Sequence, residues 1–215
     1  MSKVYSHTSD KYKCSTVQKR QNGAYVYSTE IVKNIIPAVK TTRPWVTIYL
    51  GKFCVDNAIY FIHDNLNTKR YEFLKNYKNV VAVCGVPETV EKVRPYVEKV
   101  IYLPLSVDIE WVQRFERAKD RLVCYAGRSG KPGFDTIDQE QVDMLCDMPR
   151  NTMLSELGRY LYAFFVGRTA IEAMILGCRI LPYDPRYPDP SVWKIMSNQE
   201  AAEILQHKLD TIDKR

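Results

Sequence analysis

The segment from Gly167 to Pro182 constrains the fold of this chain more than any other part of the sequence. A short helix is predicted first, with apolar residues at Ala170, Ile171, Ala173, Met174 and Leu176. Gly177 then ends the helix, because a residue without Cβ can turn the chain into the left-handed region. The compact run from Cys178 to Leu181 suits a central strand in a parallel sheet. The segment therefore predicts a helix–turn–strand unit of an α/β fold.

Glu172 is the polar exception within this apolar helix. In α/β units, ligands bind near helix N-termini and the carboxyl ends of strands, because backbone N–H groups are unpaired there. An acid in such a helix needs a partner. A ribose diol is one candidate, and a salt bridge within a plain helix–strand unit is the alternative.

Strands and helices alternate through most of the chain, which predicts an α/β fold with parallel sheets covered on both faces. Two α/β halves joined near residues 105–110 are expected, as two Rossmann-like lobes of residues 1–107 and residues 108–215. Strands are expected at residues 24–27, 45–50, 58–62, 80–84, 100–103, 122–126 and 162–166. Helices are expected at residues 28–39, 69–77, 87–97, 108–119 and 152–161, and again from Ser191 to the end.

Composition points to an ordinary globular protein, with 46% hydrophobic and 26% charged residues among 215. The sequence has no apolar run long enough to span a bilayer and no secretory signal pattern at its start. Its cysteines form no C-x-x-C pair, which favours a reducing cytoplasm and no metal site. They are Cys14, Cys54, Cys84, Cys124, Cys146 and Cys178.

The net charge of +6 is concentrated in the first half of the chain. Residues 1–110 contain 16 Lys and Arg against 10 Asp and Glu, whereas residues 111–215 contain 15 of each. Basic residues interleaved with aromatic ones suit a nucleic-acid backbone and its bases. The alternative is a solvated N-terminal arm. The opening segment provides this pattern with Lys3, Tyr5, Lys11, Tyr12, Lys13, Lys19 and Arg20.

Three segments in order resemble the GT-B glycosyltransferases: the segment with Glu172 and Gly177, the linker at residues 99–108, and the strand and basic loop at residues 122–133. The resemblance covers roughly residues 58–182. Phe164 stands where this family usually has a second acid, eight residues before Glu172, and the chain is shorter than familiar members. The resemblance implies two lobes with parallel sheets, as a minimal enzyme or as a relative that binds without turnover.

The resemblance also implies a donor site on the second lobe. Glu172 would hold the ribose of a nucleotide sugar, and Arg128 and Lys131 would neutralise its diphosphate. Gly167, Arg168 and Thr169 would border the phosphates at the start of the Glu172 helix. A guanidinium and an ammonium can stabilise the leaving group without a metal. A solvated turn is the alternative for Arg128 and Lys131.

The catalytic candidates lie in the first lobe. His63 and Asp64 follow a buried strand at its carboxyl end, where α/β sheets present their chemistry. An inverting transfer needs a base for the acceptor proton, and the intrinsic pKa of histidine suits it. Asp64 would be the base itself or orient the imidazole. In the alternative, Asp64 caps the next helix and His63 makes a surface hydrogen bond.

The sequence therefore predicts a cytoplasmic, metal-independent glycosyltransferase that uses a UDP- or GDP-sugar as donor substrate and no cofactor. The basic first lobe favours an anionic acceptor, for example a modified base in DNA, as in phage DNA glucosylation. A small metabolite, a protein and a cell-wall polymer remain open as acceptors. The alternative function is a non-catalytic protein of the same fold that binds nucleotide sugars or nucleic acid.

Overall fold

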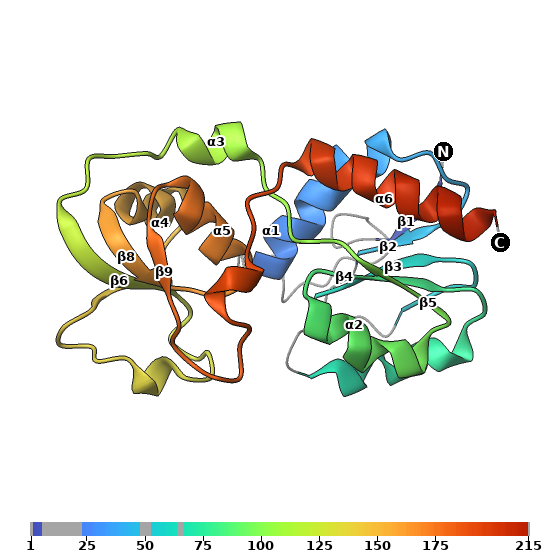
Figure 1. Ribbon diagram of the computed structural model, residues 1–215, viewed down its shortest axis with the longest axis horizontal. Helices are drawn as coiled ribbons and strands as arrows, with labels where there is room; N and C mark the ends of the chain where they lie inside the picture. Colours follow the sequence, from blue (N-terminus) through green and yellow to red (C-terminus); the bar gives the residue numbers. More distant parts are fainter. Residues whose placement is uncertain (1, 6–22, 48–52, 64–66, 215) are drawn as a thin grey trace. The chain divides into compact units, whose positions relative to one another are not determined.

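A computed structural model describes residues 2–5, 23–47, 53–63 and 67–214 of the chain. The chain divides into two compact units, which are described separately (Figure 1). The first unit contains Met1–Leu105 and Asn198–Arg215, and the second contains Ser106–Ser197. Each unit is built around one parallel sheet, which confirms the predicted α/β class with two parallel sheets.

The sheet of the first unit has five parallel strands that lie in the order of the sequence. All residues of the two strands β3 and β4 are buried, as expected for strands covered on both faces. This sequential order differs from the doubly wound order, in which the strand order reverses near the middle of the sheet. The strands are β1 (Val4–Tyr5), β2 (Trp45–Val46), β3 (Ile59–Ile62), β4 (Val81–Cys84) and β5 (Lys99–Tyr102).

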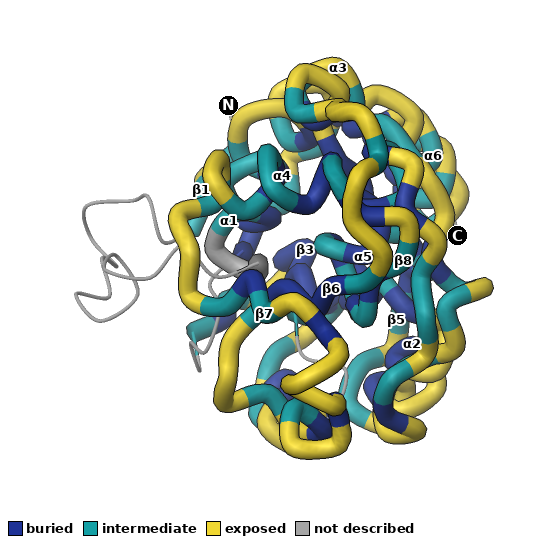
Figure 2. Tube along the Cα trace, turned by 90° about the vertical axis from the view of Figure 1, so that its left-hand side faces the viewer, coloured by how far each residue is buried: buried dark blue, intermediate teal, exposed yellow. Residues whose placement is uncertain are grey.

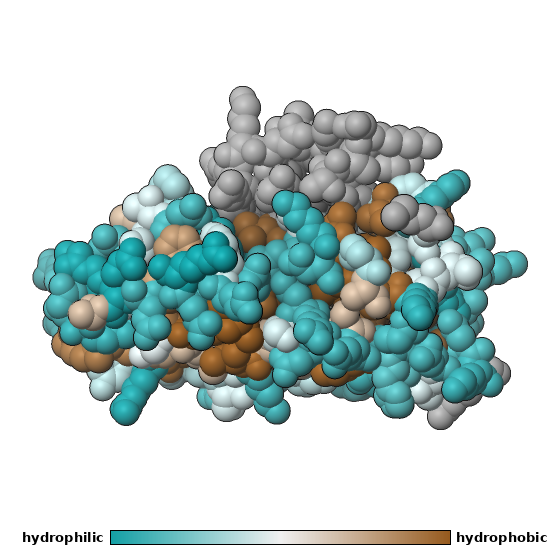
Figure 3. All heavy atoms as spheres, turned by 90° about the horizontal axis from the view of Figure 1, so that it is seen from above, coloured by the Kyte–Doolittle hydropathy of each residue, from teal (hydrophilic) through white to brown (hydrophobic). Residues whose placement is uncertain are grey.

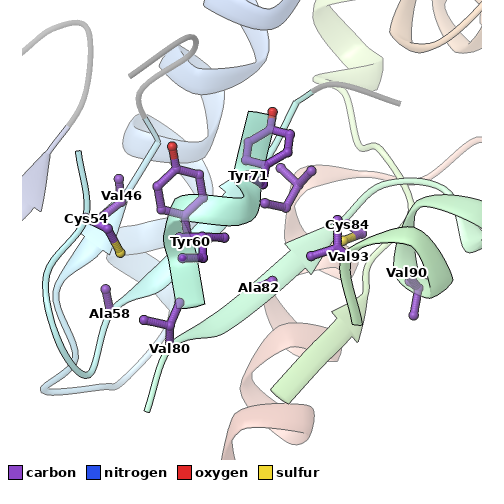
Figure 4. Packing of buried hydrophobic residues seen from close by; sticks show 12 residues of the cluster. Val46, Cys54, Ala58, Tyr60, Tyr71, Val80, Ala82, Cys84, Val90 and Val93 are labelled. Carbon is purple, nitrogen blue, oxygen red and sulfur yellow. The ribbon is translucent and has the colours of Figure 1, made fainter. Parts of the chain in front are cut away.

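Helical segments cover the two faces of this sheet (Figure 1). One face packs against α2 (Pro87–Val93) and the 3-10 segment Thr68–Asn76. Figure 4 shows Tyr60 and Ala82 of the sheet in one cluster with Tyr71 of that segment and Val93 of α2. Side chains alternate along a strand, so Ile59 and Phe61 point to the other face, where Trp45 stacks on Phe61.

The predicted strand at residues 24–27 is wrong, because this segment is helical. The structure has α1 (Gly23–Glu30), which continues into a π-helical turn, Ile31–Ile35, and a 3-10 turn, Ile36–Ala38. Tyr27, Ile31 and Ile35 are buried at intervals of four residues, which is the spacing of one helix face. Burial of this face outweighs the strand preference of the tyrosine and valine residues.

The C-terminal helix α6 (Asn198–Asp213) belongs to the first unit, although the sequence analysis assigned it to the second lobe. Ala201, Leu205 and Leu209 form its buried face, which packs near β5 and the turns that follow α1. Figure 3, which looks onto this side of the molecule, shows mostly hydrophilic side chains. The chain therefore leaves the first unit after Leu105 and returns at Asn198.

The sheet of the second unit has four parallel strands, and their order reverses at its centre. The order is β7-β6-β8-β9. After β6 the chain adds β7 on one side of that strand, and it then adds β8 and β9 on the other side. Tyr125 of β6 lies opposite Phe164 of β8 in the register of this central pair. The strands are β6 (Arg121–Gly127), β7 (Asp143–Cys146), β8 (Tyr160–Phe164) and β9 (Arg179–Leu181).

Three helices lie on one side of this sheet, namely α3 (Ile109–Gln113), α4 (Arg150–Leu157) and α5 (Arg168–Ile175) (Figure 1). Two of the five residues of α3, Glu110 and Gln113, are exposed, whereas the residues of α5 are buried or intermediate (Figure 2). The other side carries no helix longer than a 3-10 turn among the described residues. There the segment after β6 packs Phe134 and Ile137 on Tyr125.

Candidate functional site

The reversal of strand order in the second sheet places two predicted groups of donor residues at one edge. Parallel strands end at the same edge, and the connections from β6 and β8 leave in opposite directions. Such a point leaves a crevice at the carboxyl ends, where α/β proteins bind ligands. Arg128 and Lys131 follow β6, whereas Gly167, Arg168 and Thr169 follow β8.

The basic loop, defined as residues 128–133, is held by hydrogen bonds from its surroundings. The Tyr125 hydroxyl donates to the Arg128 carbonyl at 3.0 Å, and the Tyr183 hydroxyl donates to the Pro132 carbonyl at 2.9 Å. The Thr136 hydroxyl donates to the Gly133 carbonyl at 2.7 Å. These bonds fix the loop backbone, so its cationic side chains start from a defined position.

Gly133 is required by the shape of this loop. Its φ of +82° lies in the left-handed region, which residues with a Cβ rarely adopt. A Cβ at this position would also collide with the carboxylate of Asp184. The basic loop therefore packs tightly against the segment that follows β9.

Lys131 is half-buried, and its ammonium has an unusual electrostatic environment. Burial and, to a smaller extent, the positive charge of Arg128 lower the pKa of Lys131 to about 8. Desolvation and a neighbouring cation both disfavour the charged form of a lysine. An anion placed between Arg128 and Lys131 would relieve both penalties, because it would offset the two positive charges.

The N-terminus of α5 forms the other half of this edge. Gly167 precedes the helix with a φ of +68°, and a Cβ there would meet no atom within 4 Å. The space beside this helix start is therefore open. The first backbone N–H groups of a helix have no partner inside it, and the helix dipole is positive at this end. The edge thus combines a helix N-terminus with the basic loop.

Glu172 lies in α5, where the structure shows it paired with two arginines. Its side chain is 1% exposed, and its Oε1 accepts from Arg150 Nη2 at 2.5 Å. Arg168 Nε lies 3.4 Å from the same oxygen. The salt bridge left open by the sequence is therefore present. Its role at a ribose stays a prediction.

Arg150 was not identified from the sequence. It is the first residue of α4, its side chain is 12% exposed, and its guanidinium lies 5.0 Å from the ring centroid of Trp111 in α3. Trp111 packs in turn against Phe115. Arg150 precedes Glu172 by 22 residues, and no local spacing could reveal this pair. The isolated acid in an apolar helix was the only signal that a partner existed.

A pocket of about 500 Å³ lies beside this edge and was not predicted as a site. Phe165 and Val166, at the end of β8, form one part of its wall. The segment after β9 forms the rest, with Tyr183, Asp184, Tyr187 and Asp189 among four prolines. The sequence analysis treated these prolines only as a stiff loop.

His63 lies at the carboxyl end of β3 in the first unit, where the sequence placed it. Its backbone N–H donates to the Tyr71 hydroxyl at 3.1 Å, and its ring lies edge-on to Tyr27 with centroids 6.0 Å apart. Asp64 lies outside the described residues, as does the basic N-terminal segment apart from Lys3 and Tyr5. The role of His63 and Asp64 as a base stays a prediction.

Comparisons with known proteins add no further constraint: neither the protein-family models nor the curated proteins searched contain a match to this chain.

Within the described residues, no helix has the length and apolar character needed to cross a bilayer. The same residues contain no group of three or more His, Cys, Asp or Glu side chains arranged to hold a metal ion. Five cysteines of the described part are free thiols, and four of them are buried.

Proposed function

We propose that this chain is a glycosyltransferase that binds the diphosphate of a nucleotide sugar at the edge formed by β6 and β8. One observation carries the proposal. The basic loop after β6 and the N-terminus of α5 after β8 both follow the carboxyl ends of adjacent parallel strands, at the point where the strand order reverses. The position of these segments in the fold and the positive charge of the loop therefore both favour an anionic ligand at this place.

The chemistry of sugar transfer explains why this charge is useful. As the glycosidic bond breaks, negative charge grows on the departing diphosphate. Arg128 and Lys131 would stabilise that charge from the basic loop, while Gly167 and Thr169 would present backbone N–H groups from the start of α5. A guanidinium, an ammonium and a helix N-terminus can together replace a metal ion in this role.

Glu172 has two functions in this proposal. Its Oε1 holds Arg150 and Arg168 beside the helix start, as the two ion pairs indicate. Its other carboxylate oxygen, Oε2, would accept a hydrogen bond from a ribose hydroxyl. The acid would then fix both the ribose and the arginines near the diphosphate.

The acceptor chemistry is assigned to the first unit. His63 or Asp64 would remove the proton of the acceptor hydroxyl as that oxygen attacks the anomeric carbon. DNA with a hydroxylated base is the first acceptor to test, because the excess positive charge lies in residues 1–110. Binding to DNA should weaken steeply with salt, since phosphates release counterions when lysine and arginine neutralise them. Absence of DNA affinity at low salt would remove this acceptor.

Calorimetric titration with UDP and GDP tests the donor site. Arg128→Ala should lower affinity by about 10- to 150-fold, because a hydrogen bond to a charged group contributes about 1.5–3 kcal/mol. Arg121→Ala is a matched control, since Arg121 begins the same strand at the opposite edge of the sheet and pairs with Asp143. Equal effects of the two substitutions, or no binding of either nucleotide, would refute the donor site.

Turnover separates an enzyme from the alternative binding protein. Release of nucleoside diphosphate from a panel of nucleotide sugars, with varied hydroxyl acceptors, would establish transfer. Tight nucleotide binding without release under all these conditions would instead favour a non-catalytic relative. The Arg128→Ala variant serves here as the control for contaminating activity.

A further inference from the structure

The pocket beside the diphosphate edge has walls that suit a ring-shaped ligand. Its volume of about 500 Å³ lies in the range of small-molecule sites. Tyr183 and Tyr187 stack with their ring centroids 5.3 Å apart, and Phe165 lines the pocket from β8. The four prolines of the segment after β9 restrict its backbone, because each fixes φ. The aromatic wall is therefore firmly placed before any ligand arrives.

Two carboxylates line the pocket, and one of them is paired with a guanidinium. Asp184 accepts from the guanidinium of Arg186 at 2.6 and 2.8 Å, and Asp189 accepts from the backbone N–H and hydroxyl of Ser191. These hydrogen bonds lower the pKa of Asp184 to about 2 and hold that of Asp189 below its ordinary value. Both side chains are ionised at neutral pH. Arg186 offsets the charge of Asp184 and occupies its oxygens. The exposed Asp189 carboxylate can therefore accept hydrogen bonds from hydroxyl groups and repel a carboxylate.

The pocket adjoins both halves of the diphosphate edge. Asp184, in the pocket wall, packs directly against Gly133 of the basic loop. Val166, also in the wall, immediately precedes Gly167 at the start of α5. A ligand that reaches from the edge into the pocket thus passes from a cationic region to one whose unpaired charge, on Asp189, is negative. Such a ligand carries its phosphates at one end and a neutral group at the other.

We propose that this pocket holds the sugar ring of the donor and selects neutral, hydroxyl-rich sugars over sugars that carry a carboxylate. The proposal rests on the nucleotide-sugar function proposed above and adds the class of sugar. The aromatic wall contacts the C–H faces of the ring, and Asp189 accepts from its hydroxyl groups. A uronic acid is disfavoured because its charge meets the Asp189 carboxylate, whose partners are the N–H and hydroxyl of Ser191 rather than a cation.

Calorimetric titrations of the full chain with UDP, UDP-glucose and UDP-glucuronic acid test this selection. The GDP, GDP-mannose and GDP-mannuronic acid series is used if the chain prefers guanosine. The neutral sugar nucleotide should bind about threefold to fivefold more tightly than its carboxylated partner at low ionic strength, because one exposed like charge a few ångströms away contributes about 1 kcal/mol of repulsion. Equal affinities, or a preference for the uronic acid, would overturn the selection and leave nucleotide binding intact.

Asp189→Asn tests whether the pocket is responsible. Asparagine keeps an oxygen that can accept from Ser191, so the local turn is retained. The affinity for the carboxylated sugar should rise about threefold to fivefold, with that for the plain diphosphate unchanged. Asp138→Asn is the matched control, because Asp138 makes the same type of turn with the backbone N–H of Glu140 outside the pocket. Equal effects of both substitutions would refute the assignment.

Tyr187→Ala distinguishes the sugar from the nucleobase as occupant. Loss of the aromatic wall should lower the affinity for the neutral sugar nucleotide about fivefold to tenfold and leave that for the diphosphate unchanged. Tyr187→Phe, which keeps the ring, should retain the wild-type values. A parallel loss of diphosphate affinity would place the base in the pocket and overturn the proposal. If no nucleotide binds at all, the proposed function and this inference fail together.

Discussion

Replacing Glu172 by glutamine should destabilise the second unit strongly, because the carboxylate holds two arginines in a buried site. The side chains of Glu172, Arg168 and Arg150 are 1%, 4% and 12% exposed, and both guanidiniums contact Oε1. Removing one partner of a buried ion pair costs about 3–5 kcal/mol, since the remaining charge stays out of water without compensation. We expect Glu172→Gln to lose a free energy of unfolding in this range.

A double-mutant cycle gives the sharper test. Arg150→Met alone should destabilise the protein, because it removes the ion pair and the contact with Trp111. In the Glu172→Gln background the same change should restore stability, since it removes a buried charge that has lost its partner. The effect of Arg150→Met should therefore change sign, with a coupling energy of about 2–3 kcal/mol.

Urea unfolding followed by tryptophan fluorescence measures these effects. The chain has 3 tryptophans, and Trp45→Phe in every variant leaves Trp111 and Trp193, which both belong to the second unit. A loss below about 1 kcal/mol for Glu172→Gln would refute the structural role of the carboxylate. Weaker nucleotide binding with unchanged stability would instead assign Glu172 to the ribose alone.

Four further predictions follow from the two units. Diphosphate binding just above pH 8 should take up protons, because a bound anion raises the lowered pKa of Lys131. The affinity for the diphosphate should therefore fall as pH rises through 8. Calorimetry in two buffers of different ionisation enthalpy measures the proton uptake, and persistent uptake in Lys131→Met would contradict the prediction. Gly133→Ala should cost about 1–3 kcal/mol in urea unfolding through its positive φ and its collision with a carboxylate, whereas Gly130→Ala, in open space, should be neutral. His63→Ala should lower turnover about a hundredfold and leave the nucleotide dissociation constant unchanged, and full turnover would eliminate it as the base. A chain of residues 106–197 should fold and bind nucleotide like the full chain, because the structure assigns these residues to one compact unit; circular dichroism and calorimetry would reveal an unfolded chain.

The sequence predicted the strands β3, β4 and β6 well because each is a compact apolar run bounded by polar or turn residues. It also predicted the start of α3, where the Asp108 carboxylate accepts from the Trp111 N–H at 3.0 Å. Local signals of this kind act within a few residues. The predicted bounds of β8 were two residues too late, because the prediction was residues 162–166 and the strand is Tyr160–Phe164. The apolar run continues to Val166, beyond the end of the strand. An apolar run alone does not mark where pairing stops.

The parts of the site that escaped prediction depend on contacts distant in sequence. The wall of the pocket is fixed by the Tyr183 hydroxyl on the Pro132 carbonyl, across 51 residues. Arg150 meets Glu172 across 22 residues, and its position follows from how α4 packs beside α5. Neither the spacing of apolar residues nor a helix-capping residue indicates such pairs in the sequence. The sequence could name Arg128, Lys131 and Glu172 as candidates, but only the fold shows which atoms they face.

The strand orders of the two sheets explain why donor binding is assigned to one unit and proton removal to the other. In the second unit the order reverses between β6 and β8, so the connections separate and leave room for a ligand at the carboxyl edge. In the first unit the described strands follow one another without reversal, and this sheet offers no equivalent crevice between two adjacent strands. In the proposed glycosyltransferase, His63 would therefore provide a single reactive group at the end of β3, and the charged nucleotide would bind at the strand reversal of the second unit.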